Sequence, residues 1–213
     1  MSEFRLNRVF SGYLTRVLLK TPLTPNQITL LSLGFGILTG FLFSRGEYFH
    51  SLAAAGSYQL AVVLDNCDGE VARAKNKKSR LGGWLDVASD ILTDIALFLG
   101  VALGMKRQDL PGPVNLFLVL CLSGAVLHFF LVVAEKIKGF GPAVFEAPHP
   151  EHERRNSLVL VFFDALREGD ASWLVVFFAV IGQTQALLWA GGIYMQLLWI
   201  SALFLNFRWV FGR

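Results

Sequence analysis

The segment that decides the fold is residues 65–90, which read DNCDGEVARAKNKKSRLGGWLDVASD. It contains two pairs of aspartates, and the members of each pair are three or four residues apart, so on a helix they share one face. One short basic loop separates the two pairs. We therefore expect two antiparallel helices whose carboxylates converge at one end of the helix pair. The four aspartates are Asp65, Asp68, Asp86 and Asp90.

An apolar chain surrounds this segment. Of its 213 residues, 54% are hydrophobic and 16% are charged, whereas about 25% are charged in a typical soluble domain. A helix needs about 20 mostly apolar residues to cross a bilayer. Apolar stretches predict an all-α, polytopic membrane protein built as a bundle of six transmembrane helices, at residues 28–43, 49–64, 92–104, 114–134, 173–190 and 193–210.

Several boundaries of these helices can be refined from single residues. Extended through the aspartates, the second and third spans become helices near residues 48–74 and 82–105. Thr24-Pro25-Asn26 predicts a capped start for the first span, because proline cannot continue a preceding helix. Gly191-Gly192 is expected to separate the fifth span from the sixth.

Residues 1–22 differ from the spans that follow, because basic residues are interspersed among their apolar ones. This pattern predicts an amphipathic helix at the membrane surface, followed by the six-span domain at residues 23–213. The alternative is a helix that packs on its own protein. The apolar positions are Phe4, Val9, Phe10, Tyr13, Leu14, Val17 and Leu18, and the basic ones are Arg5, Arg8, Arg16 and Lys20.

Basic residues are distributed unevenly between the loops of this six-span arrangement. Of the 19 lysines and arginines, 16 fall on the side of the two termini and 3 (Arg45, Lys106 and Arg107) fall on the other side. Cytoplasmic loops of membrane proteins carry the excess of basic residues. We therefore expect a protein of the cytoplasmic (inner) membrane, with both termini and the aspartates at the cytoplasmic face.

Four carboxylates in one small region of a membrane protein are costly. A single aspartate at the centre of a membrane helix costs about 2.5–3.5 kcal/mol, and like charges close together repel one another. Arg73 is the only basic residue close to the first pair before the loop. Two divalent cations, Mg²⁺ or Mn²⁺, bound through carboxylate oxygens would neutralise all four charges. The alternative is that the aspartates are ordinary residues of the membrane interface.

Small residues accompany the aspartates. Gly69 and Ala72 leave space for a ligand against the first helix, and Gly82 and Gly83 permit close approach of helices at the start of the second. The complete pattern resembles the signature of the CDP-alcohol phosphotransferase family, D-x2-D-G-x2-A-R-x8-G-x3-D-x3-D. Every fixed position of that signature is present, as Asp65, Asp68, Gly69, Ala72, Arg73, Gly82, Asp86 and Asp90.

The resemblance covers residues 20–105 well and the remainder only as a pattern of hydropathy. It implies a six-helix membrane bundle, usually a homodimer, that transfers a substituted phosphate from a CDP-linked donor to the hydroxyl of an alcohol and releases CMP. It also implies roles for the residues of the signature. Asp65, Asp68 and Asp86 would bind the metal ions, Asp90 would be a metal ligand, the general base or both, and Asp65, Asp68, Gly69, Ala72, Arg73 and Gly82 would bind the CDP group.

The substrates are less closely defined than the reaction. CDP-diacylglycerol is the expected donor, because it would enter from the bilayer, and the acceptor is a small alcohol such as serine, glycerol phosphate or inositol phosphate. The stretch KTPLTPNQIT at residues 20–29 is similar to the phosphotransferase half of enzymes that join CDP-inositol to inositol phosphate. We expect no fused nucleotidyltransferase, so the donor would be supplied ready made. Candidate acceptor-binding residues are Lys136, Arg154, Arg155 and Arg167, each of which can instead serve as a membrane-facing cation.

Two other functions fit paired aspartates in a membrane. An intramembrane prenyltransferase also binds a metal-bound diphosphate, although the D-G-x2-A-R spacing and the short loop argue against it. A divalent-cation transporter would need polar residues that continue through the later spans, which have few. The expected partners are the lipid bilayer, the CDP-linked donor, the alcohol acceptor and a second copy of the chain, with no nucleic acid.

Overall fold

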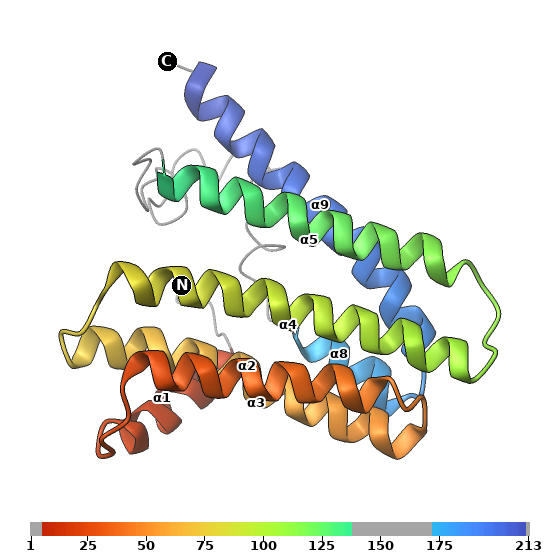
Figure 1. The fold of residues 1–213 in the computed structure, drawn as a ribbon, viewed down its shortest axis with the longest axis horizontal. Coiled ribbons are helices and arrows are strands. Elements are labelled where there is room, and N and C mark those ends of the chain that lie inside the picture. The colour runs from red at the N-terminus through yellow and green to blue at the C-terminus, as the bar shows by residue number, and fades with distance from the viewer. Residues whose placement is uncertain (1–5, 138–171, 212–213) are drawn as a thin grey trace.

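The computed structural model describes residues 6–137 and 172–211, and every regular element within these ranges is an α-helix (Figure 1). This confirms the all-α prediction for the described part of the chain. The helices are α1 (Leu6–Leu18), α2 (Pro25–Phe43), α3 (Tyr48–Ala74), α4 (Arg80–Arg107), α5 (Val114–Ile137), α8 (Ser172–Val180) and α9 (Thr184–Phe211). Among the described residues, α2, α4 and the Val114–Ala134 part of α5 are long and apolar enough to cross a membrane.

The helix α4 lies in the middle of the bundle, with α2 and α3 on one side and the pair α5 and α9 on the other (Figure 1). On the first side α2 packs against both α3 and α4, and α1 packs against α3. A buried apolar core runs between α2, α3, α4, α5, α8 and α9, and a smaller one joins α1, α2 and α3. The two helices that carry the aspartates are therefore held from both sides.

The start of α2, the end of α3 and the start of α4 lie at the same end of the bundle. The side chain of Thr24 caps α2 by accepting a hydrogen bond from the backbone of Gln27, and the Gln27 side chain accepts one from the backbone of Thr24. This confirms the predicted cap. Ser79 caps α4 in the same way, by accepting from the backbone of Gly82. The Lys75 ammonium, just after α3, donates to two carbonyl oxygens of the α1–α2 connection, each at 3.0 Å.

Glycines bring α2 and α4 into backbone contact. A Cβ atom added at Gly40 of α2 would overlap the carbonyl group of Ala96 on α4, and one added at Gly100 would overlap the backbone of Gly40. At Gly104 an added Cβ would overlap the carbonyl oxygen of Phe43. Close approach of this kind is how small residues drive association of membrane helices. The observed limits of α3 and α4 confirm the predicted helices at 48–74 and, within two residues, 82–105.

The division of the last two predicted spans is wrong. The helix α8 ends at Val180, Gly182 adopts a positive φ of 71°, and α9 begins at Thr184 and continues through Gly191 and Gly192. A glycine in the left-handed conformation is a common end to a helix. The glycine pair has a different role, because an added Cβ at Gly191 would overlap the ring of Phe98 on α4. These glycines let α9 pack closely, and they do not interrupt it.

The helix α1 presents its polar side to the bundle. Asn7, Ser11 and Thr15 are buried, together with Leu18 at the end of the helix. The large apolar side chains of α1 are instead exposed at Leu6, Val9, Phe10, Tyr13 and Val17. An apolar outer face is what a helix in contact with lipid requires, and its position at the membrane surface remains a prediction.

The contact between α2 and α4 can be tested with one methyl group. We expect Gly40→Ala to lower stability by about 1–3 kcal/mol, because the added Cβ must push two backbones apart. The matched control is Gly34→Ala on the same helix, where an added Cβ meets no atom within 4 Å. Both cysteines, Cys67 and Cys121, are buried and free, so a thiol-reactive dye reports unfolding of the protein in detergent. Equal melting temperatures for the two variants would contradict the inferred contact.

Candidate functional site

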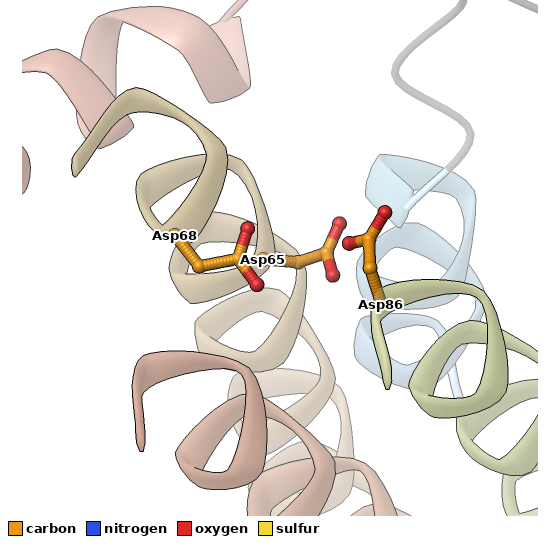
Figure 2. A group of neighbouring side chains, drawn as sticks. All are labelled: Asp65, Asp68 and Asp86. Carbon is orange, nitrogen blue, oxygen red and sulfur yellow. The ribbon is translucent and has the colours of Figure 1, made fainter. Parts of the chain in front are cut away.

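Three carboxylates converge between α3 and α4 (Figure 2). Asp65 and Asp68 extend from α3 and Asp86 extends from α4 into the same space. One oxygen atom from each residue can be chosen so that all three lie within 4.8 Å of one another. Asp68 is buried and the other two are half-buried. Carboxylate oxygens grouped in this way are the ligands that hard divalent cations prefer.

One atom of this cluster indicates that a ligand belongs there. Oδ1 of Asp65 is buried and has no hydrogen-bond partner among the described residues. A buried carboxylate oxygen without a partner is unfavourable, and two neighbouring carboxylates make it more so. A divalent cation would satisfy this oxygen and offset the repulsion. The residues present therefore fit a bound metal ion.

A residue of α2 holds one of the three carboxylates. The buried hydroxyl of Thr29 donates a hydrogen bond to Oδ2 of Asp68. This bond joins two residues that are 39 positions apart in sequence, on α2 and α3, and limits the directions in which Asp68 can point. The aspartate signature does not include Thr29. The sequence signal for it is its place one turn after Pro25 at the start of α2, on the same face of the helix.

Asp90 lies one turn along α4 from Asp86 and is exposed. It does not belong to the group of three converging carboxylates. It is nevertheless near enough to Asp65 on α3 for the two carboxyl groups to repel each other. Of the four predicted aspartates, Asp65, Asp68 and Asp86 therefore converge, and Asp90 lies next to them without belonging to the group. Such a fourth carboxylate can take part in metal binding or accept a proton from a ligand.

The three carboxylates form one wall of a cavity of about 480 Å³, a size suited to a small-molecule ligand. Every residue that the signature assigns to CDP binding lines this cavity: Asp65, Asp68, Gly69, Ala72, Arg73 and Gly82. Other lining residues come from α1, the start of α2, α3 and the α3–α4 loop, and the sequence patterns alone do not indicate them. They include Arg8, Asn26, Thr29, Asn66, Lys77, Lys78 and Ser79.

The two signature glycines also make space for protein side chains. A Cβ atom added at Gly69 would lie 3.4 Å from Nη1 of Arg73, so this glycine leaves room for the guanidinium group. At Gly82 an added Cβ would lie 3.0 Å from Oδ1 of Asn26 and 3.1 Å from Oγ of Ser79. Gly82 therefore lets the first turns of α2 and α4 approach each other. The backbone N–H groups at such helix starts favour anionic ligands.

The charges around the cavity indicate what it can bind. Four basic side chains, those of Arg8, Arg73, Lys77 and Lys78, line the same space as the carboxylates. Once cations neutralise the carboxylates, this lining is strongly positive. Phosphate groups match it, because they bind both divalent cations and basic side chains. The geometry is therefore that of a site for a phosphorylated ligand held through metal ions.

The candidate acceptor residues are not tested by this geometry. Lys136 belongs to α5, one residue before that helix ends at Ile137, and its side chain is outside the described part. Arg154, Arg155 and Arg167 lie outside the described residues altogether. Their part in acceptor binding stays a prediction.

Comparison with known proteins adds independent information. A sequence profile of CDP-alcohol phosphatidyltransferases matches residues 22–147. The archaetidylinositol phosphate synthase of Pyrococcus horikoshii is 34% identical over 146 residues, which are 68% of this chain and 70% of that protein. The bifunctional IPC transferase and DIPP synthase of Archaeoglobus fulgidus is 28% identical over 194 residues. The match covers 86% of this chain, but the chain spans only 37% of the length of that bifunctional relative.

The fold is similar to that of the phosphatidylinositol phosphate synthase of Mycobacterium tuberculosis. The structure solved in complex with manganese and citrate has a TM-score of 0.56 and 18% sequence identity, and the match covers 92% of this chain and 88% of that one. The structure with CDP-DAG bound has a TM-score of 0.53 and 20% identity, covering 85% and 94%. At these identities the likeness supports the fold.

Removal of the Thr29 hydroxyl tests the hydrogen bond to Asp68. We expect Thr29→Val to weaken Mn²⁺ binding by about 10- to 100-fold, which is typical when a group that orients a metal ligand is lost. Thr29→Ser keeps the hydroxyl and should stay close to wild type. Thr39→Val is a matched control, since Thr39 is buried on the same helix and bonds only to the carbonyl of Phe35. Calorimetric titration with Mn²⁺ measures the effect, and equal affinities for the two valine variants would refute the role of Thr29.

Proposed function

The chain belongs to the CDP-alcohol phosphatidyltransferase family, and we propose that it transfers a substituted phosphate from a CDP-linked donor to the hydroxyl of a small alcohol, with release of CMP. The observation that carries this proposal is the cavity in which three converging carboxylates face four basic side chains. A diphosphate-linked nucleotide is complementary to such a lining. The family match over residues 22–147 includes every residue of the signature.

We propose that Asp65, Asp68, Asp86 and Asp90 hold two divalent cations, either Mg²⁺ or Mn²⁺. When bound, such cations neutralise the donor diphosphate and stabilise the departing CMP. The grouping of three carboxylates and the unpartnered oxygen of Asp65 support this assignment. Thr29 keeps Asp68 oriented toward the cavity through its hydrogen bond.

The cytidine diphosphate group would lie against the surface formed by Gly69, Ala72 and Gly82, beside the metal-binding residues Asp65 and Asp68. Five of the six residues in this assignment expose small or acidic side chains to the cavity, and the sixth, Arg73, supplies positive charge. Its guanidinium lies next to Gly69. From there Arg73 can steady the aspartates or the nucleotide phosphates.

Asp90 is proposed as the general base, in addition to its part in metal binding. It accepts the proton of the acceptor hydroxyl as that oxygen bonds to the phosphorus of the transferred group. The bond from this phosphorus to the oxygen of CMP breaks, and CMP leaves as the phosphate anion. The position of Asp90 beside the three grouped carboxylates supports this role, because the acceptor must approach from the side opposite to the leaving group.

The membrane supplies the donor in this proposal. The three apolar helices and the membrane-protein relatives support an integral membrane protein. We propose six spans, a homodimer, and an active site and termini at the cytoplasmic face of the inner membrane. CDP-diacylglycerol would then reach the cavity sideways from the bilayer. Relatives named archaetidylinositol phosphate synthase and phosphatidylinositol phosphate synthase make a phosphorylated inositol the first acceptor to test, bound by Lys136, Arg154, Arg155 and Arg167.

A product assay tests the reaction. The purified protein in lipid vesicles is given CDP-diacylglycerol or CDP-inositol with Mg²⁺ or Mn²⁺ and a panel of alcohols that includes serine, glycerol phosphate and inositol phosphate. We expect CMP release that requires one donor and one acceptor and that stops when a chelator removes the metal. Release of pyrophosphate without CMP would point to a prenyltransferase instead. Metal flux that needs no CDP donor would point to a transporter.

Substitution of Asp90 separates chemistry from binding. We expect Asp90→Asn to lower kcat by about 100- to 10,000-fold, because the amide cannot accept the proton of the acceptor. Binding of the CDP-linked donor, measured by calorimetric titration, should remain largely intact. Asp109→Asn, in the α4–α5 connection and away from the cavity, is the control. Turnover of the Asp90 variant at the wild-type rate would exclude Asp90 as the base.

A further inference from the structure

The helix α1 is attached to the bundle by polar side chains on its inner face. The Asn7 amide donates to Oγ of Ser172 on α8 at 2.9 Å and accepts a hydrogen bond from Gln59 on α3. One turn later, the Ser11 hydroxyl donates to Oε1 of Glu70 on α3 at 2.8 Å. Helices that only rest on a membrane need no such bonds. These contacts fix the position and rotation of α1 relative to α3.

The fixed rotation of α1 turns Arg8 toward the cavity. Arg8 lies between Asn7 and Ser11 in the sequence and lines the same space as Asp68 and Arg73. Its side chain is exposed and forms no ion pair with any carboxylate of the described residues. An arginine that lines a cavity together with three carboxylates, and forms no ion pair within the described part of the chain, is available to an anionic ligand.

A second arginine on the same helix has different surroundings. The guanidinium of Arg16 lies 5.4 Å from the centre of the Tyr13 ring, on the exposed apolar side of α1. Arg16 does not line the cavity. It therefore suits the membrane-facing role expected for basic residues of this helix. The two arginines share a helix and a charge but face different environments.

We propose that Arg8 is a phosphate-binding residue of the cavity, so that α1 forms part of the substrate site. This inference rests on the proposed function, because it assigns a further residue to the same cavity. A guanidinium binds two phosphate oxygens at once through parallel N–H groups. The phosphate comes either from the diphosphate of the donor or from a phosphorylated acceptor, which present the same chemistry to Arg8.

The charges support a need for such a residue. Two divalent cations offset four carboxylates, so the diphosphate of the donor still requires positive partners. Arg73 is placed next to Gly69 and close to Asp68, and Lys75 is engaged with the α1–α2 connection. Within residues 6–137 and 172–211, Arg8 is the basic residue that lines the cavity from outside the signature segment of α3, α4 and their loop. It thus adds a positive charge to the cavity from α1, an element that lies outside the signature.

Binding measurements that need no turnover test Arg8. Wild type, Arg8→Gln, Arg8→Lys and Arg16→Gln are titrated in detergent with CDP in the presence of Mn²⁺, and separately with inositol phosphate. We expect Arg8→Gln to lower the binding affinity for one of the two ligands by about 10- to 100-fold. This is the effect of losing a charge-assisted hydrogen bond made through two N–H groups. Arg8→Lys should lose part of that affinity, and Arg16→Gln should bind both ligands as wild type does.

The ligand whose affinity is lowered identifies the source of the phosphate that Arg8 binds. Loss of CDP affinity assigns Arg8 to the donor, and loss of inositol phosphate affinity assigns it to the acceptor. Affinities of Arg8→Gln within twofold of wild type for both ligands overturn the proposal, and so does an equal loss in Arg16→Gln. Thermal unfolding with the thiol-reactive dye checks the fold, and Arg8→Lys, which keeps the charge, carries the test if Arg8→Gln proves unstable.

Failure of this inference differs from failure of the proposed function. A wild-type protein that binds CDP with Mn²⁺ but releases no CMP from any donor contradicts the transferase reaction and leaves the Arg8 test valid. A protein that releases CMP, with Michaelis constants for donor and acceptor unchanged in Arg8→Gln, keeps the reaction and excludes Arg8. A wild-type protein that binds neither ligand overturns both.

Discussion

Repulsion between the carboxylates of Asp65, Asp68 and Asp86 is the constraint on which the arrangement of this protein depends. Three acidic groups within 4.8 Å, at the end of two apolar helices, are stable only with compensating positive charge. The elements around them supply or make room for that charge. Basic side chains line the cavity, and the buried oxygen of Asp65 without a hydrogen-bond partner suits a cation.

The packing of α2 against α4 sets the distance between the two aspartate-bearing helices. The backbones of α2 and α4 touch at Gly40, Gly100 and Gly104. One helical turn before Gly40, toward the site, Gly36 leaves room for the side chain of Thr93. Because α2 also packs along α3, it fixes the position of α3 relative to α4. Asp86 can then meet residues that come from the preceding helix. Small residues deep in the bundle thus control the geometry of charged ones at its end.

The helix α1 has two sides that suit the two environments required by the proposed reaction. Its apolar side chains face outward and suit lipid, while its polar side chains bind α3 and α8 and bring Arg8 to the cavity. If α1 lies at the membrane surface as predicted, it is placed between the bilayer, which would supply the donor, and the polar site, where the acceptor would react.

The sequence alone determined the features that depend on neighbours along the chain. These are the limits of α3 and α4, the cap at Thr24 and the pairing of aspartates three or four residues apart, because helical spacing and capping are local. Only the tertiary structure decided that Thr29 binds Asp68, that Arg8 reaches the cavity, and that α9 runs through Gly191 while Gly182 ends the preceding turn. A glycine can end a helix or admit a neighbour, and an arginine can face lipid or ligand. The choice is made by side chains that pack from helices distant in sequence.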